Sequence, residues 1–367
     1  MGTAPNDPTN SAASLQIDAF LGMLAKLDNL TLTASYSPRM VETPPPQGSG
    51  LAVVHAGRLG LEYRTSSTGH ILLQQLGSFG RNDYSPLVSS TPLSGPAAPR
   101  ITDPRLPTKA LLSIVDSDSS ISGEQALSRR FKIHGTLGYV LSGGADSIAQ
   151  QYIPLMRGGR GSAGADWLAT PSDRLNLGIS GWYSKFTNGS RATLTTITAG
   201  WDHAIGANTR SDVGIGSAMG ESSGPTAGGS PTPYPWVAAG IAHTIPMRGQ
   251  SVSGSLRLSA TPQVDRTNGD VYELASGSAS LGWSLERVLR LAASGSFGRA
   301  LSGIQQVGTQ LVTAEGSASV PAGLATFSVG VRGFWQSVPP PAPGTLAVPG
   351  FQWAVFGQFV FGVHGTP

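Results

Sequence analysis

The ionisable residues of this chain alternate with apolar residues inside short segments. In residues 130–142, RFKIHGTLGYVLS, the basic residues Arg130, Lys132 and His134 take every second position. Alternate residues of an extended strand share one face. Basic groups that face a confined, wet space attract anions, orient sugar hydroxyls and carboxylates, and hinder cations. The pattern selects these candidates for such a face: Arg58, Glu62, Arg64, Arg130, Lys132, His134, Arg174, Arg257, Arg290 and Arg332.

A structural interpretation accounts for the same residues. Acidic and basic side chains on one face can pair with each other and stiffen a wall without binding any ligand. Glu286 and Glu315 are further acids available for such pairs. The alternation fits both interpretations, so both are kept.

No motif of the sequence indicates an enzyme or a cofactor site. The six histidines are scattered and show no metal-ligand spacing. The glycine-rich stretch 157–166, RGGRGSAGAD, lacks the lysine and hydroxyl of a P-loop and is interpreted as a flexible loop. The absence of Cys excludes disulfides, thiolate-bound zinc, iron–sulfur clusters and c-type haem attachment. We therefore predict no catalytic residue, no metal site and no cofactor. A formal charge of +3 without a clustered basic stripe also argues against nucleic-acid binding.

The same two-residue period recurs along most of the chain. Residues 251–260, SVSGSLRLSA, place Val252, Leu256 and Leu258 on one face and four serines with Arg257 on the other. Only residues 14–27 also fit a helical stripe. Counted with weaker segments between 145 and 170, the pattern predicts about 16–18 strands. The clearer segments are 30–37, 57–64, 130–142, 251–260, 274–285, 289–297, 312–320, 325–335 and 351–363, and the weaker ones are 70–80, 110–116, 174–186, 191–205, 211–219 and 236–245.

The connections between these strands are of two lengths. Strand pairs within 283–290 and 319–325 leave only a few residues for a turn. Residues 38–50, 81–108, 220–235 and 336–350 are long and rich in Pro, Gly and Ser. Short turns at one end and long loops at the other are typical of an outer-membrane β-barrel. We also expect that 81–128 or 143–173 contains a loop that folds into the lumen.

The composition indicates that the apolar face meets lipid. Charged residues make up 12% of the chain, against about 25% in soluble domains. No run approaches the roughly 18 apolar residues of a membrane-spanning helix. Aromatic residues near strand ends are candidates for the interfacial girdles of a barrel, although a place in a packed core is the alternative. These are Tyr63, Tyr139, Trp182, Tyr183, Trp236, Trp283, Trp335, Phe351 and Trp353.

The predicted fold is all-β, a single closed antiparallel transmembrane β-barrel over residues 28–367. Residues 1–27 would be an N-terminal extension in the periplasm or the lumen. The first residues show no basic and apolar regions of a signal peptide. We expect that the sequence is that of a mature exported chain.

Two resemblances follow from particular stretches. The last strand, FQWAVFGQFVFGV at 351–363, resembles the C-terminal signal of bacterial outer-membrane β-barrels, with Phe359 and Phe361 as the signal residues. It departs from that pattern because Val363 and four further residues follow. The resemblance implies outer-membrane lipid and the barrel-assembly machinery as partners. SYSPR at 35–39, VVHAGRLGLEYRT at 53–65 and LLQQLGSFGRNDYS at 72–85 are similar to barrels that accompany Wzx/Wzy-type exopolysaccharide export, which implies passage of a polymer.

The functional prediction is a channel in the bacterial outer membrane for a hydrophilic, anionic or saccharide cargo. One alternative is a sheath or scaffold around a partner lipoprotein, motility component or cytochrome. Another is a soluble or secreted β-rich adhesin. A periplasmic export or scaffold protein is a further partner under the first two hypotheses.

Overall fold

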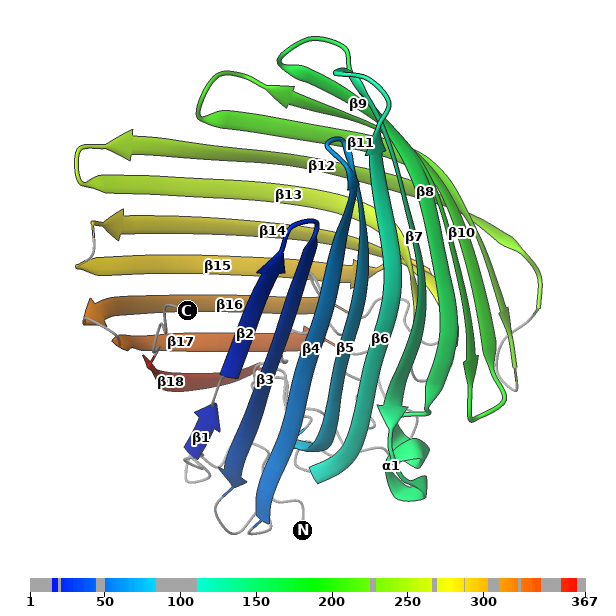
Figure 1. Cartoon of the computed structure of the whole chain (residues 1–367). Helices are drawn as coiled ribbons and strands as arrows, with labels where there is room; N and C mark the ends of the chain where they lie inside the picture. The colour runs from blue at the N-terminus through cyan, green and yellow to red at the C-terminus, as the bar shows by residue number, and fades with distance from the viewer. Residues whose placement is uncertain are drawn as a thin grey trace.

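The computed structural model describes residues 15–18, 21–43, 50–83, 111–224, 229–265, 269–286, 288–302, 310–322, 325–337 and 351–361. One sheet contains all the strands (Figure 1). The strands are β1 (Leu15–Asp18), β2 (Leu21–Leu27), β3 (Leu30–Thr43), β4 (Gly50–Ser66), β5 (Gly69–Asp83), β6 (Leu111–Ala126), β7 (Phe131–Gly144), β8 (Met156–Leu168), β9 (Asp173–Phe186), β10 (Arg191–Ala204), β11 (Thr209–Ser223), β12 (Thr232–Met247), β13 (Gln250–Val264), β14 (Val271–Leu285), β15 (Leu289–Ala300), β16 (Gln310–Ala322), β17 (Ala325–Ser337) and β18 (Phe351–Phe361).

Each strand from β2 to β18 pairs antiparallel with the next one along the chain. Strand β1 pairs with residues 39–42 of β3, and β2 pairs with residues 30–36 of the same strand. The 18 strands therefore occupy 17 positions across the sheet. The number and the antiparallel pairing agree with the prediction.

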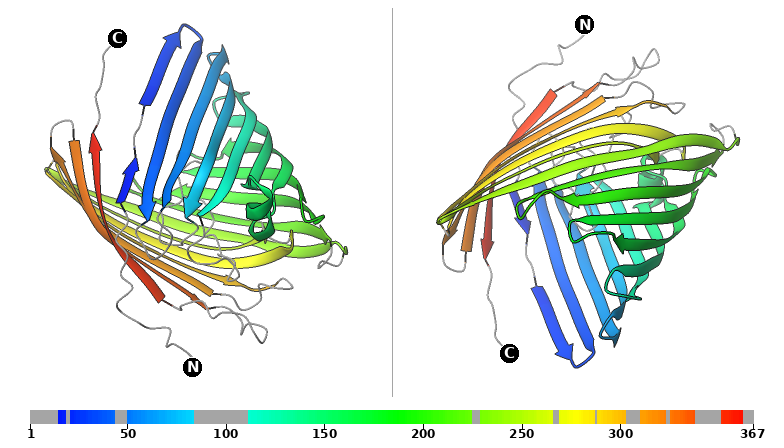
Figure 2. Two further views of the ribbon diagram at one scale, coloured as in Figure 1. Left: turned by 90° about the horizontal axis from the view of Figure 1, so that it is seen from below. Right: turned by 90° about the horizontal axis from the view of Figure 1, so that it is seen from above.

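The predicted closure of the barrel is not established. Among the residues that the structure describes, β18 pairs only with β17, and β1 and β2 pair only with β3. Because the strands alternate in direction over an odd number of positions, β18 and β2 point the same way. Figure 2 shows these two edges near each other, on the open side of a sheet that bends into two walls.

The predicted boundary at residue 28 does not coincide with an edge of the sheet, because β1 and β2 precede it. The alternation of Leu15 and Ile17 is the signal that placed this segment in a strand, and it outweighed the helical stripe over 14–27. Residues 1–14 lie outside the described residues, so their location as an extension remains a prediction.

The sequence analysis interpreted the glycine-rich stretch 157–166 as a flexible loop. The structure shows instead that it is the centre of β8. The reason lies in its neighbours. A Cβ atom at Gly164 would lie 2.4 Å from His134 Nε2, and one at Gly158 would lie 2.4 Å from the carbonyl oxygen of Tyr183. Glycine is thus required for strand packing here, so it does not mark a break in the sheet.

The two ends of the sheet differ as predicted. Short turns join β2 to β3, β4 to β5, β6 to β7, β8 to β9 and the following pairs up to β16 and β17. The longer connections all lie at the opposite end. One of them, residues 145–155, contains the helix α1 (Ser147–Tyr152). Ala149 and Ile153 of this segment pack on Leu112 and Ile114 of β6.

Asp146 caps α1 because its carboxylate accepts a hydrogen bond of 2.8 Å from the Ala149 amide. That hydrogen bond holds the pKa of the Asp146 carboxyl below its ordinary value. Within the described part of the chain, no helix is long and apolar enough to span a membrane.

The two faces of the sheet have opposite chemistry. Leu137, Leu177 and Ile215 belong to the apolar parity and are 66%, 64% and 61% exposed. The polar parity carries the ion pairs. The same face carries a buried hydrophobic cluster, which residues of β7 to β10 form with Val271 of β14. It is therefore the inner face. A soluble protein would bury its apolar parity, so the exposed apolar exterior is the face that suits lipid.

Candidate functional site: the inner face of the sheet

The inner face carries a row of paired charges on β6 to β13. Lys132 Nζ lies 2.8 Å from Glu124 Oε1, and His134 Nδ1 lies 3.8 Å from Asp166 Oδ2. Arg257 Nη2 lies 3.7 Å from Asp212 Oδ2, across Gly240 of the strand between them. These contacts show that two of the predicted lumen cations, Lys132 and Arg257, are balanced by acids on nearby strands, and that His134 lies beside a carboxylate.

The other predicted lumen residues differ in their places in the sheet. Arg58, Glu62 and Arg64 of β4 have the inner parity, and the Arg58 guanidinium lies against the Gln74 amide, whose oxygen accepts from Nε at 3.0 Å and from Nη2 at 2.6 Å. Arg174 and Arg290 also have the inner parity and begin strands at the short-turn end. Arg130 lies in the turn before β7, not in a strand. Arg332 stands opposite Glu315 in register, and the structure describes only its backbone.

Hydroxyl groups line the wall formed by β13 to β17. Ser251 and Ser284, Ser255 and Ser280, and Ser259 and Ser276 face each other as three hydrogen-bonded pairs of 2.6, 2.7 and 2.8 Å. Further hydroxyl pairs follow on the next strands, between Ser296 and Thr313 at 2.6 Å and between Ser328 and Ser319 at 2.9 Å. This serine ladder, defined as the three pairs on β13 and β14, gives the wall a neutral and hydrogen-bonding surface.

The sheet fills part of its own interior at the long-loop end. Residues 261–264 of β13 continue past the last residue that pairs with β12, which is Ala260. The tip of the β13–β14 hairpin then lies against β11 and β12. The Val271 amide donates to Ser222 Oγ at 2.8 Å, and the Tyr234 hydroxyl donates to the Val271 carbonyl at 2.8 Å. Val271 forms a buried cluster with Val140, Met156, Phe186 and Ala192 of β7 to β10.

A cavity of about 570 Å³ adjoins this cluster. Its wall contains Arg160, Trp182 and Leu194 in one row of the sheet and Thr136, Ser162, Ser180 and Thr196 in the next row. Residues 262–264 of the β13–β14 tip form the opposite side. None of the seven wall residues except Trp182 was singled out from the sequence, and the alternation of hydroxyls along β8 to β10 is the signal that could have found them.

The outer face carries aromatic residues at two levels. Trp167, Leu175 and Trp201 stand in register across β8 to β10, and Tyr139 and Tyr183 stand in register on either side of Gly159. Eight residues separate Leu175 from Tyr183, which is about 26 Å along a strand. The apolar band of a transmembrane barrel is of similar height, about 25 Å.

The structure shows the face on which the predicted girdle residues lie, and their place in a membrane girdle remains a prediction. Tyr63, Tyr139, Tyr183, Trp283 and Trp335 have the outer parity. Trp182 and Trp236 face the interior instead, because Trp182 packs against the buried cluster and Trp236 covers Gly214. Trp167 and Trp201, which were not predicted, are both exposed on the outer face. The side chains of Phe351, Trp353, Phe359 and Phe361 lie outside the described residues, so the girdle and assembly-signal predictions for β18 remain predictions.

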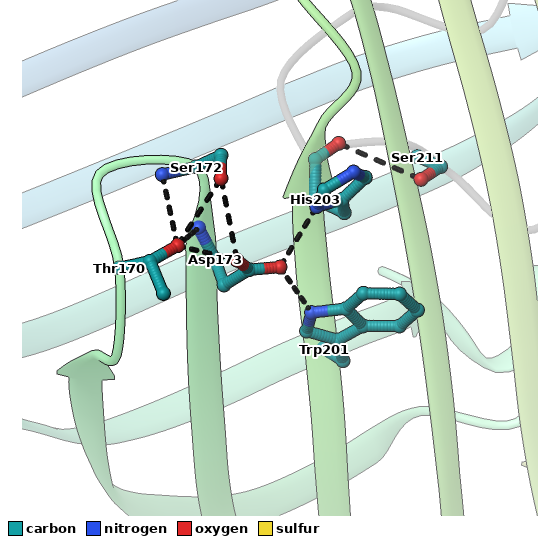
Figure 3. Close-up of polar contacts among 6 residues, drawn as sticks. All are labelled: Thr170, Ser172, Asp173, Trp201, His203 and Ser211. Carbon is teal, nitrogen blue, oxygen red and sulfur yellow. Dashed lines mark hydrogen bonds and ion pairs between the residues drawn. The ribbon is translucent and has the colours of Figure 1, made fainter.

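A polar cluster lies at the short-turn end of the outer aromatic level that Trp167 and Trp201 form (Figure 3). Asp173 Oδ1 accepts from Trp201 Nε1 at 3.0 Å and lies 2.7 Å from His203 Nδ1. Its other oxygen accepts from Thr170 and from Ser172, both in the β8–β9 turn, and Ser211 donates to the His203 carbonyl at 3.5 Å. The cluster ties the turn to the end of β10 and places the Trp201 indole where lipid headgroups would meet it.

Among the described residues, no group of three or more His, Asp or Glu side chains could hold a metal ion.

Comparisons with known proteins point to export. The profile of the EpsX exopolysaccharide export family matches residues 2–348. No curated protein sequence matches the chain. The predicted likeness to outer-membrane barrels and exopolysaccharide export is confirmed, as is the location in the bacterial outer membrane.

Among solved structures, two variants of the FrpB iron transporter from Neisseria meningitidis are similar. The F5-1 variant has a TM-score of 0.55 and 10% identity, with 94% of this chain and 66% of that chain covered. The F3-3 variant has a TM-score of 0.53 and 12% identity, with 89% and 62% covered. The ferric-catecholate import receptor Fiu from E. coli K12 has a TM-score of 0.51 and 10% identity, with 96% and 74% covered. At these identities the likeness concerns the fold, and this chain spans less than two thirds of FrpB.

Proposed function

We propose that this chain, which belongs to the EpsX exopolysaccharide export family, guides a saccharide polymer along its inner face through the outer membrane. The serine ladder of β13 and β14 is the observation that carries the proposal. Serine hydroxyls both donate and accept hydrogen bonds, as sugar hydroxyls do. A moving polymer can therefore exchange one hydroxyl partner for the next at little net cost.

The paired charges of the inner face support the same role. Lys132, Arg160 and Arg257 each lie within 4 Å of a carboxylate. Balanced pairs keep the wall polar without creating a site of strong net charge that would hold the cargo. A wall of weak and neutral contacts suits passage better than tight binding, because the cargo must also leave.

Passage of a polymer requires an enclosed path, and we propose that the sheet closes between β18 and the edge formed by β1 and β2. The two edges lie near each other (Figure 2), and among the described residues no backbone pairing joins them. In a bilayer such edges cost free energy, because lipid cannot satisfy the backbone hydrogen bonds. Closure would join parallel strands, since β18 and β2 point the same way.

An anionic cargo is the second candidate. Arg64, Arg174 and Arg290 lie on the inner parity within two residues of a short turn, and no ion pair among the described residues involves them. In outer-membrane barrels the short turns face the periplasm. These arginines would give the periplasmic mouth an attraction for acidic groups of the polymer, or for an acidic periplasmic export protein.

The direct test is surface polymer. Cells that lack the chain should lose exopolysaccharide at the cell surface, and the wild-type chain should restore it. A variant with Ser251, Ser255 and Ser259 replaced by Val should restore less polymer than wild type at equal barrel abundance. The matched control replaces Leu256 and Leu258, on the outer face of the same strand, by Val. Surface polymer that is unchanged in cells without the chain would refute the proposal and favour the sheath or scaffold role.

A further inference from the structure

The cavity beside the β13–β14 tip has the chemistry of a ligand site. Its volume of about 570 Å³ falls within the usual range of small-molecule pockets. It is formed by strands far apart in the sequence, since residues 262–264 close a wall made by β7 to β10. We propose that it binds one or a few neutral sugar units of the exported polymer, an inference that rests on the proposed function.

The wall combines a flat apolar surface with a row of hydroxyls. Trp182 stands between Arg160 and Leu194 in register. In the adjacent row Thr136, Ser162, Ser180 and Thr196 stand side by side on four consecutive strands. Neighbouring strands lie about 4.8 Å apart, so the hydroxyl row extends about 14 Å. A sugar ring has an apolar face of C–H groups and an edge of hydroxyls, which match the indole and the hydroxyl row.

Two donors at this wall have no hydrogen-bond partner among the residues that the structure describes. Arg160 Nε and Trp182 Nε1 are both buried and unpaired. Buried donors in native proteins are nearly always satisfied, and an exception calls for an explanation. Oxygen atoms of a bound sugar, reached after a small movement of either side chain, would satisfy them. The polar groups of the cavity are thus not fully occupied by one another.

The charge balance of the cavity favours a neutral ligand. Arg160 Nη2 lies 2.8 Å from Asp118 Oδ1, so its charge is already matched. Gly138 allows this pair, because a Cβ atom there would lie 2.9 Å from Arg160 Nε. A carboxylate on the ligand would compete with Asp118 for the Arg160 guanidinium, and the Asp118 carboxylate would repel it. Neutral hydroxyls meet no such competition.

The experiment uses the full chain in detergent and isothermal titration with two probes. These are a neutral glucose hexasaccharide and a galacturonate hexasaccharide of equal length. We expect the neutral probe to bind at least about tenfold more tightly than the acidic one. Trp182→Leu and the nearly isosteric Thr196→Val should each weaken the neutral probe by about tenfold, the loss expected for one strong contact. Asp118→Asn should narrow or reverse the preference between the probes.

The matched control is Trp236→Leu. Trp236 also faces inward but lies against Gly214, outside the cavity. Its replacement should leave binding of the neutral probe unchanged. Equal or tighter binding of the galacturonate probe would overturn the neutral-sugar assignment. Neutral-probe binding that survives both Trp182→Leu and Thr196→Val would overturn the cavity as the site.

The outcomes separate this proposal from the proposed function. Absence of binding by either probe would overturn the cavity site, while the surface-polymer assay would still decide the export role. Cells without the chain could lose surface polymer while the Trp182→Leu variant still exports it fully. That result would also count against the cavity as a site that the polymer must occupy during export. Unchanged surface polymer in cells without the chain would refute export itself, whatever the titration shows.

Discussion

Glycine residues on the inner face determine where the large polar side chains can lie. A Cβ atom at Gly240 would lie 2.4 Å from Asp212 Oδ1, and one at Gly200 would lie 2.3 Å from Asn176 Oδ1. The side chains of Asp212 and Asn176 therefore lie over glycines of neighbouring strands. The many glycines of this chain keep polar groups close to the wall and leave the space beyond them free.

The ion pair of Asp118 and Arg160 gives a prediction at the scale of one residue. Asp118→Asn removes one negative charge from the inner face and leaves the Arg160 guanidinium unbalanced. We expect the reversal potential in a planar bilayer to shift towards anion preference, because the inner surface becomes more positive.

Asp173→Asn is the matched control for this change. It removes the same charge from the outer face, where the carboxylate accepts from Trp201. A shift of equal size in both variants would show that Asp118 does not border the conducting path.

At the scale of the element, the strands separate a lipid face from a cargo face. Leu256 is 47% exposed on the outer parity of β13, six residues from the short-turn end. Leu256→Arg should lower the free energy of unfolding in lipid by about 2–4 kcal/mol, the cost of an arginine near the middle of the apolar band. Denaturant titration in lipid vesicles, followed by tryptophan fluorescence, measures this change.

Ser253→Arg provides the comparison on the same strand. Ser253 has the inner parity, where a guanidinium remains in water. We expect a change smaller than about 1 kcal/mol, as for ordinary surface substitutions. Similar costs for both substitutions would contradict the assignment of the two faces.

The sequence predicts the elements well where the alternation is regular. The period of two placed strands throughout the chain, and the loop lengths indicated which end carries the short turns. The period failed in β8, where glycine occurs on both parities and hides the alternation. The choice of aromatic residues near strand ends placed Trp182 and Trp236 on the wrong face. Aromatic character predicts a girdle, but only the parity within the strand decides whether a ring meets lipid or the interior.

At the scale of the whole molecule, the unpaired edges pose the main question. The chain has no Cys, so a pair of introduced cysteines reports on closure without background. Met23→Cys on the outer parity of β2 should form a disulfide with Val355→Cys, Gly357→Cys or Phe359→Cys, on the outer parity of β18, when β2 and β18 pair, since a disulfide needs Cα atoms within about 7 Å. Electrophoretic mobility before and after reduction detects the crosslink.

Met23→Cys combined with Val331→Cys on β17, which has the same outer parity, is the control, because a further strand would separate these positions. No crosslink with any β18 position in the oxidised, lipid-inserted protein would contradict closure by β18 and β2.

The interior cavity could not have been predicted from the sequence. It joins residues of β7 to β10 with residues 262–264, which follow almost 70 positions after Thr196. Strand period and composition do not indicate that the tip of the β13–β14 hairpin separates from β12 after Ala260 and lies across the interior. The charged pairs were predictable only in part. Lys132 and Arg257 were found by their parity, whereas Arg160 and the acidic partners Glu124, Asp118 and Asp212 were identified only in the structure.

The most direct test of the account is single-channel conductance of the purified chain in a planar bilayer, with the neutral glucose hexasaccharide added to one side. We predict stable conductance steps that the hexasaccharide interrupts for brief periods, and fewer or shorter interruptions for Trp182→Leu. Stable steps that the hexasaccharide leaves unchanged, or an inserted protein that conducts no ions, would contradict an open saccharide path along the inner face.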